Sequence, residues 1–66
     1  MNAKDILTQV YNLLQEGGYN PVQQISGYLL SGDPTYITDY QGARALIVSA
    51  DREQLLLELV RGYING

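Results

Sequence analysis

The first part of the chain alternates apolar and polar side chains with the period of a helix. In residues 3–16, AKDILTQVYNLLQE, apolar side chains recur three and four positions apart, with polar residues on or near the opposite side. The pattern predicts an amphipathic helix that ends at Gly17-Gly18, because glycine adopts the left-handed conformation at a helix C-terminus at little steric cost. The apolar positions of this helix are Ile6, Leu7, Val10, Tyr11, Leu13 and Leu14.

A second helical segment begins at Asn20-Pro21. Asn20 is a favourable N-cap because its side chain can accept a hydrogen bond from an unpaired backbone N–H, and Pro21 suits the first helical position, where no donor is needed. The predicted helix runs from about Pro21 to Ser31, where Ser31-Gly32 ends it. The side chains expected to face inward are those of Val22, Ile25, Leu29 and, as a further candidate, Tyr28.

Gly27 lies in the middle of this second helix. A glycine inside a helix costs about 1 kcal/mol relative to alanine, so its presence there needs a reason. The preferred explanation is that a neighbouring helix approaches closely at this point, and contact with a ligand is the alternative.

Two further cap signals follow. Asp33-Pro34 repeats the Asn20-Pro21 pattern and opens at least one turn in the segment PTYI. Thr38 begins TDYQ, a capping-box pattern in which the Thr38 hydroxyl caps the helix and Gln41 reaches back to the Thr38 N–H. These signals predict a third helix over about 39–49. Its expected apolar positions are Tyr40, Ala43, Leu46, Ile47 and Ala50.

The last segment, REQLLLELVRGYI, carries the densest run of leucines. Asp51, with Gln54 three residues later, provides its start signal. The apolar positions extend well beyond one stripe, and a helix that is apolar on more than one side must be covered on more than one side. Because a chain of four short helices covers only one side, we expect a second copy of the chain to cover the other. The predicted dimer interface comprises Leu55, Leu56, Leu57, Leu59, Val60 and Tyr63.

Together these segments predict an all-α fold, a compact homodimeric bundle of about four short helices, with residues 1–66 as a single dimerising domain. The length favours self-association, because a chain of about 60 residues buries only roughly 60% of the surface that it exposes when unfolded. The chain has no Cys or His, so neither disulfides nor a structural zinc site supports it. Its hydrophobic content of 45% is enough for a core and one further apolar face.

Charge and the lengths of the apolar runs narrow the range of partners. The formal net charge is -3, with basic side chains only at Lys4, Arg44, Arg52 and Arg61. This balance repels phosphate, which argues against binding to nucleic acid or to anionic membrane surfaces. No apolar run approaches the ~18 residues of a membrane span, and the N-terminal segment lacks an apolar signal-peptide region. We therefore expect a soluble, cytoplasmic protein without membrane insertion.

The motif GYLLSGDPTYI at residues 27–37 does not fit a catalytic or cofactor site. A phosphate-binding loop needs several glycines followed by Lys and Ser or Thr, whereas SGDPTY has one glycine and no Lys. General acid–base catalysis needs a second carboxylate near Asp33, but Asp39 and Asp51 lie where helix caps are expected. The sequence thus predicts no catalytic residue, no cofactor and no metal site. It assigns Asn20, Asp33, Thr38 and Asp51 as helix caps.

The aromatic side chains are six tyrosines, with no phenylalanine. Each phenol hydroxyl needs water or a polar partner when its ring packs. Four of these residues fall around the two corners of the chain, namely Tyr19, Tyr28, Tyr36 and Tyr40. One interpretation is half-buried rings at helix ends and at a dimer interface. The other is a protein-binding patch, since tyrosine is favoured as an interface anchor.

The segments GYNPVQQISGYLLSGDPTYI, DYQGARALI and LLLELVRGYI together resemble the IreB-like family of small regulatory phosphoproteins of Gram-positive bacteria. The similarity extends from about Asp5 to Ile64. The resemblance implies a small, all-helical homodimer that acts without catalysis. It also implies a protein partner, a membrane-bound Ser/Thr kinase with extracellular PASTA repeats, in a pathway that governs cell-envelope stress and cephalosporin tolerance.

Two departures from the family pattern concern regulation. Family members usually carry an N-terminal arm with the phosphorylated threonines ahead of the first helix, and no residue of this sequence matches those sites. The basic character around the AR-x-LI segment is reduced to Arg44 and Arg52, so a partner that recognises this surface is expected to differ. The candidate partner surface comprises Tyr19, Tyr28, Tyr36, Tyr40 and Arg44.

The threonines of the sequence itself, Thr8, Thr35 and Thr38, lie in a predicted helix or at predicted helix starts. A kinase must grip several residues of extended chain, which a packed helix corner offers poorly. We therefore expect these threonines to be poorer substrates than threonines in a disordered arm.

Two other function classes are alternatives to a dimeric regulatory interaction module. The helix, short corner and helix between Pro21 and Ala50 are similar to a helix-turn-helix, which makes a nucleic-acid-binding protein the main alternative, although the segment lacks a basic recognition face. An enzyme is disfavoured, because no combination of acid, base and nucleophile is present.

Overall fold

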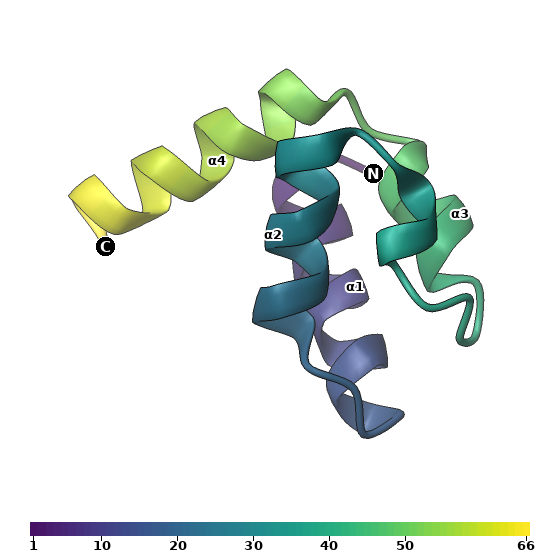
Figure 1. Cartoon of the computed structure of the whole chain (residues 1–66). Helices are drawn as coiled ribbons and strands as arrows, with labels where there is room; N and C mark the ends of the chain where they lie inside the picture. The colour runs from purple at the N-terminus through teal and green to yellow at the C-terminus, as the bar shows by residue number, and fades with distance from the viewer.

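Four α-helices and one short 3-10 helix make up the fold, which contains no β-strand (Figure 1). The structure is a computed structural model that describes residues 1–66. The helices are α1 (Ala3–Glu16), α2 (Pro21–Ser31), α3 (Ala43–Val48) and α4 (Arg52–Asn65), and the 3-10 helix η1 (Pro34–Tyr36) lies between α2 and α3. The predicted compact all-α class with four helices is confirmed.

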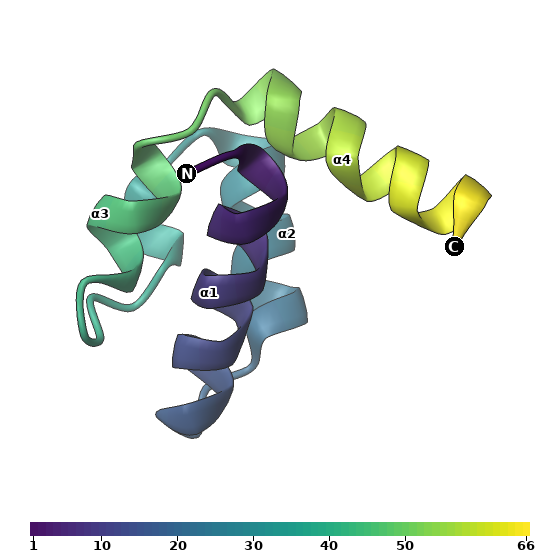
Figure 2. The same ribbon diagram turned by 180° about the vertical axis from the view of Figure 1, so that it is seen from behind.

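Helices α1 and α2 lie side by side and run in opposite directions, with α3 and η1 packed beside them (Figures 1 and 2). Helix α4 begins at the end of this body where α1 starts and α2 ends. It packs against α1 near its own start, and its C-terminal half extends away from the other helices. Every residue from 59 to 66 is exposed as a result.

Helix α1 has the predicted bounds, and residues next to it in the sequence close both of its ends. The Asp5 N–H donates a hydrogen bond to Asn2 Oδ1 at 2.9 Å. At the other end, the Tyr19 N–H donates to Leu14 O at 2.9 Å while Gly18 adopts a φ of +82°, as in a Schellman motif. Gly18 is therefore the residue of the Gly-Gly pair whose left-handed backbone requires glycine.

The predicted bounds and caps of α2 and η1 are also confirmed. The Gln23 N–H donates to Asn20 Oδ1 at 3.1 Å at the start of α2. The Thr35 N–H donates to Asp33 Oδ1 at 3.0 Å at the start of η1. Both caps act on backbone groups two or three residues ahead, so the local sequence is sufficient to specify them.

The inward face of α2 differs from the prediction at one position. Ile25 and Tyr28 are buried as expected, but the predicted inward orientation of Val22 is wrong, because its side chain is 66% exposed. Pro21, one position earlier, is the buried residue in the first turn. The buried face of α2 is therefore rotated relative to the predicted one, and Val22 lies at its edge.

The segment between η1 and α3 is where the sequence prediction fails most clearly. Helix α3 begins at Ala43 rather than near residue 39, and its N-cap is Gly42, which makes no side-chain capping bond. The assignment of Thr38 as a helix cap is therefore wrong. The Thr38 N–H donates to Gln24 Oε1 at 2.9 Å, and the Thr38 hydroxyl accepts from Gln24 Nε2 at 2.8 Å. Gln24 of α2 thus takes the hydrogen bond that the capping box assigned to Gln41.

Helix α4 has its predicted N-cap, but one of its leucines predicted for the dimer interface is buried in the core. The Glu53 N–H donates to Asp51 Oδ1 at 2.9 Å, which confirms Asp51 as the cap. Leu55 is the only buried residue of α4, and none of its surface is accessible. The prediction that Leu55 belongs to an intermolecular surface is wrong, because the chain's own core already covers it. Leu55 instead anchors α4 to the body.

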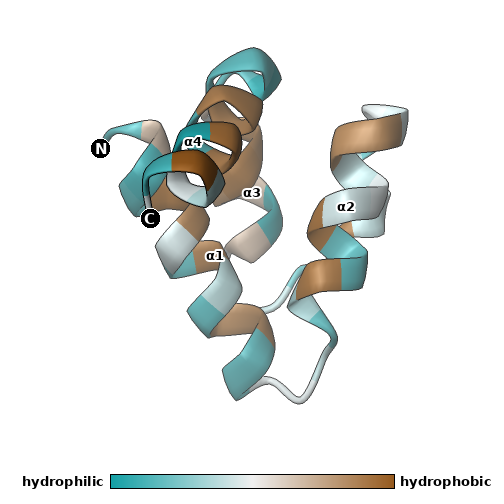
Figure 3. Ribbon diagram, turned by 90° about the vertical axis from the view of Figure 1, so that its left-hand side faces the viewer, coloured by the Kyte–Doolittle hydropathy of each residue, from teal (hydrophilic) through white to brown (hydrophobic).

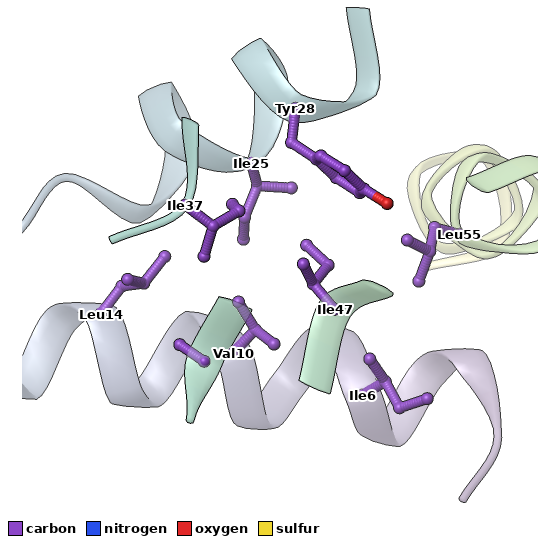
Figure 4. Close-up of a cluster of buried hydrophobic side chains, with 9 residues drawn as sticks. Ile6, Val10, Leu14, Ile25, Tyr28, Ile37, Ile47 and Leu55 are labelled. Atoms are coloured by element: carbon purple, nitrogen blue, oxygen red, sulfur yellow. The ribbon is translucent and has the colours of Figure 1, made fainter. Parts of the chain in front are cut away.

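One hydrophobic core joins all four helices (Figure 4). Helix α1 supplies three of its side chains at intervals of four residues, so a single stripe of α1 faces the other elements. The core comprises Ile6, Val10, Leu14, Ile25, Tyr28, Ile37, Ala43, Ile47 and Leu55. All nine are apolar or aromatic, so packing rather than buried charge holds the elements together.

The reason for Gly27 in the middle of α2 is a close approach, as predicted. The Tyr36 ring of η1 packs against the α2 backbone at this point. A Cβ atom built on Gly27 would lie 2.8 Å from Tyr36 Cε1 and closer still to Cδ1. The absence of a side chain at position 27 therefore lets η1 fold back onto α2.

We expect Gly27→Ala to lower the free energy of unfolding by about 1 kcal/mol, because overpacking against the Tyr36 ring costs about 1–3 kcal/mol and exceeds the gain of about 1 kcal/mol in helix propensity. In a Tyr36→Ala background the same substitution should instead raise the free energy of unfolding by about 1 kcal/mol. Chemical denaturation of the four chains measures both effects. Equal stabilisation in both backgrounds would show that the ring is not the reason for the glycine.

Candidate interaction surface

Helix α4 carries several strongly hydrophobic residues (Figure 3), and most of their side chains are exposed. Tyr63 is 87% exposed, Ile64 71% and Val60 59%, and exposed apolar side chains become informative where several of them gather on one helix, as they do here. The structure leaves five of the six residues predicted for the dimer interface on the surface. The exposed apolar residues of α4 are Leu56, Leu57, Leu59, Val60, Tyr63 and Ile64.

These side chains do not all face the same way. Leu56, Val60 and Ile64 follow at intervals of four and form one line along α4, which we call the outer stripe. Leu59 precedes Val60 by about 100° around the helix, and it faces the body of its own chain, where it lines a groove with α1 and α2. The outer stripe therefore has no counterpart within the chain.

An apolar groove with a volume of about 400 Å³ lies between α1 and α2. We call it the α1/α2 groove. No charged side chain lines it, and six of its eight lining residues are hydrophobic. The lining residues are Leu7, Thr8 and Tyr11 of α1, Val22, Ile25, Ser26 and Leu29 of α2, and Leu59 of α4.

The sequence did not reveal this groove. Helical spacing identifies Leu7 and Tyr11 as apolar positions of the first helix and predicts Val22 to face the interior. Their common surface arises only from the way in which α1 and α2 pack, which no local pattern encodes. The one available signal was that α1 carries more apolar positions than its buried stripe of Ile6, Val10 and Leu14 uses.

The four corner tyrosines do not form one patch. Tyr28 is buried in the core, so its assignment to a partner surface is wrong. Tyr19 and Tyr40 do come together, with ring centroids 5.9 Å apart in an edge-to-face arrangement. Tyr36 lies over Gly27 and remains half exposed. The tyrosines therefore close the corners of the fold, and Tyr19, Tyr36 and Tyr40 keep part of their surface accessible.

Three of the four basic side chains bind groups of the chain itself. Arg44, a candidate for the partner surface, is half-buried and donates from Nε to Ile37 O at 2.9 Å. Arg52 donates from Nη1 to Leu29 O at 2.9 Å. Arg61 pairs with Glu58 at 3.5 Å. No cluster of free cations results, and the surface offers no basic face for a phosphate backbone.

Asp33 is held by two hydrogen bonds from one residue. Its Oδ1 atom accepts from the Thr35 hydroxyl at 2.7 Å and from the Thr35 N–H at 3.0 Å. These bonds, with a smaller contribution from the positive charge of Arg44, hold the pKa of the Asp33 carboxyl below its usual range. A carboxylate that stays ionised and bound to its own turn is suited to capping rather than to proton transfer.

The three threonine hydroxyls are engaged in the folded chain. Thr8 donates to Lys4 O at 2.9 Å within α1. Thr35 donates to Asp33, and Thr38 accepts from Gln24. Thr8 and Thr35 are thus fixed in a helix and in a 3-10 turn. Thr38 lies outside any helix or turn, and its hydrogen bonds with Gln24 hold it in place.

The structure contains neither a cluster of metal-ligating side chains nor a membrane-spanning helix. No three side chains of the types Asp, Glu, His and Cys converge as a metal site. None of the helices is both long enough and apolar enough to cross a membrane. What the structure assembles is an apolar stripe, an apolar groove and a set of helix corners that hold them.

The sequence from residue 1 to residue 65 matches the family model described as IreB regulatory phosphoprotein. The match covers all four helices and both surfaces described above.

We expect the stability contributed by Asp33 to depend on pH. Because the folded pKa lies below that of the unfolded chain, the contribution is present above the unfolded pKa and is lost as the pH falls through the folded pKa. Asp33→Ala should lower the melting temperature at about pH 7 by a few degrees. Asp33→Asn should be milder, because the amide oxygen can still accept from Thr35.

Thermal unfolding of the three chains from about pH 7 down to about pH 2 tests this expectation. The wild-type advantage over both variants should shrink as the pH falls. An advantage that is the same at every pH, or an Asp33→Ala chain that melts like the wild type at pH 7, would contradict it.

Proposed function

Since this chain belongs to the IreB family of regulatory phosphoproteins, we propose that it acts without catalysis, as a homodimeric interaction module in a pathway linked to a Ser/Thr kinase. The kinase that we propose is of the PASTA type, and the proposed pathway is the response to cell-envelope stress that sets cephalosporin tolerance. A regulatory protein works through contacts with other proteins. The surface that makes such contacts is therefore the part of the structure on which the function depends.

The observation that supports the proposal is the exposed apolar surface of α4. One core of nine residues uses only Leu55 from this helix. Six large apolar side chains remain in contact with water, and contiguous apolar surface of this kind marks sites of protein association. Because a chain of 66 residues has little other surface to bury, pairing of two copies is the most economical way to cover α4.

The nucleic-acid-binding alternative has less support. A recognition helix needs several free basic side chains that point into a groove of the duplex. Helix α3, which would take that position, has six residues, and its one arginine, Arg44, donates to Ile37 O. The net charge of -3 adds a general repulsion from phosphate.

We expect the wild-type chain to be a dimer at micromolar concentration and Val60→Glu to be a monomer. The substitution would place an unpaired charge in an apolar interface, which costs several kcal/mol. Val60 is 59% exposed within one chain, so the variant should keep its helical content. Sedimentation equilibrium gives the mass, and Gln54→Glu, which adds the same charge to the polar side of α4, is the matched control. A monomeric wild type, or a dimeric Val60→Glu chain, would contradict the proposed interface.

The same pair of variants tests the pathway in cells. In a strain that lacks the gene, the wild-type chain and Gln54→Glu should restore the normal survival in cephalosporin, and Val60→Glu should not. If loss of the gene leaves survival in cephalosporin unchanged, the proposed pathway is wrong even where the dimer is found.

We expect Thr8, Thr35 and Thr38 to be poor kinase substrates in the folded chain, because a kinase binds a free, extended segment. Thr8 and Thr35 lie in helices, and Thr38 is bound to Gln24 through its N–H and its hydroxyl. Incubation with the catalytic domain of a PASTA-type kinase, followed by intact-mass measurement, should give substoichiometric addition of phosphate at these sites. A synthetic peptide covering residues 30–42 controls for sequence preference, because Thr35 and Thr38 are unfolded in it. Near-stoichiometric phosphorylation of any of the three threonines in the folded dimer would contradict this prediction.

A further inference from the structure

The chain carries two unpartnered apolar surfaces, the outer stripe of α4 and the α1/α2 groove. We infer that in the homodimer the outer stripe of each copy occupies the α1/α2 groove of the other copy. The inference rests on the proposed function, because it specifies how the proposed dimer forms. In this arrangement the two α4 helices do not simply pack against each other. Each α4 contacts the groove of the other copy, so the same stripe-to-groove contact occurs twice.

The chemistry of the groove suits an apolar helix face. Its lining has no charged side chain, and the only polar side-chain groups among its residues are the hydroxyls of Thr8, Tyr11 and Ser26. Phosphate, nucleic acid or a charged peptide would find no counter-charge there. The outer stripe offers aliphatic side chains at intervals of four, which is how amphipathic helices anchor in grooves.

The apolar groove continues into a neighbouring hollow. A second hollow, of about 560 Å³, continues it beneath α4, and Leu7, Thr8 and Leu59 line both. Lys4, Glu58 and Arg61 are the charged residues of this second hollow, so charges appear only at the outer end. An apolar centre with a polar edge is the usual composition of a protein interface.

The position of Leu59 points to a second copy as the occupant. Leu59 lies on α4 next to Val60 of the outer stripe, and its side chain also lines the groove. Stripe and groove are therefore adjacent parts of one continuous surface. In a two-fold dimer every contact is made twice, so a stripe that enters the groove of the other copy implies the reverse contact as well, and such an interface closes with both surfaces covered.

A chain cannot fill its own groove with its own stripe. Leu55 in the core and the hydrogen bond from Arg52 to Leu29 O fix the start of α4 on the body. With the helix held there, Leu59 faces the groove, and the stripe residues Val60 and Ile64 point elsewhere. Only another molecule can therefore cover the stripe.

The area that a stable dimer needs also favours the exchange. An interface of standard size buries about 800 Å² per partner, which is close to one fifth of the 4347 Å² that this chain exposes. Pairing of two outer stripes alone would leave both grooves in water. The reciprocal arrangement covers the stripe and the groove of each copy together, and so buries more apolar surface per residue.

Cysteine cross-linking tests the arrangement directly, because the chain has no cysteine of its own. Val22→Cys is made in an isotope-labelled chain and Val60→Cys in an unlabelled chain, and the two are mixed at micromolar concentration and oxidised. Intact mass distinguishes the mixed disulfide from the two symmetrical ones. Val22 lines the groove and Val60 lies on the outer stripe, so both positions are accessible in one chain.

We expect the mixed disulfide to form on the order of a hundredfold faster than with Gln23→Cys in place of Val22→Cys, because paired thiols reach millimolar effective concentration. Gln23 is the matched control, one position along α2 and outside the groove. A Val60→Cys chain that cross-links only to itself, or a dimer in which position 22 never cross-links to position 60, would overturn the exchange while leaving the dimer intact. A monomeric wild type in sedimentation would instead overturn the proposed dimer itself.

Discussion

The burial of Leu55 is the interaction on which the arrangement of the molecule depends. It is the only side chain of α4 in the core, and it fixes the first turn of that helix against the body. The remaining length of α4 gains no comparable contact, so its apolar side chains stay in water. One buried leucine thus determines both that α4 is attached and that most of it is free to contact another molecule.

The parts of the fold that could be predicted are those specified by neighbouring residues. Asn20, Asp33 and Asp51 each accept a hydrogen bond from an N–H two or three residues ahead, so short motifs placed the helix starts correctly. Thr38 has the same kind of local signal, but Gln24, fourteen residues away, binds both its N–H and its hydroxyl. A tertiary hydrogen bond replaced the local one, and the third helix begins later than the sequence indicated.

For the candidate surface too, the features set by local sequence could be predicted and those set by tertiary packing could not. Helical spacing showed that α4 has more apolar positions than one face can use, and the structure leaves six of them exposed. The spacing did not show which leucine enters the core, because Leu55, Leu56 and Leu57 are chemically equivalent in the sequence. It also did not show the α1/α2 groove, whose residues come from two helices and meet only after these pack. The family resemblance, carried by long local motifs, is confirmed.

The motif GYLLSGDPTYI is connected to the proposed function through the position of α4 rather than through chemistry of its own. Arg52 at the start of α4 donates to Leu29 O at the end of α2. Its guanidinium lies where a side chain on Gly32 would be, since a Cβ atom there would approach Arg52 Cζ to 3.0 Å. Gly32 therefore permits this contact, and Asp33 holds the next turn in place. With Leu55, the corner fixes the direction in which α4 leaves the body, and that direction determines where the outer stripe is presented to a partner.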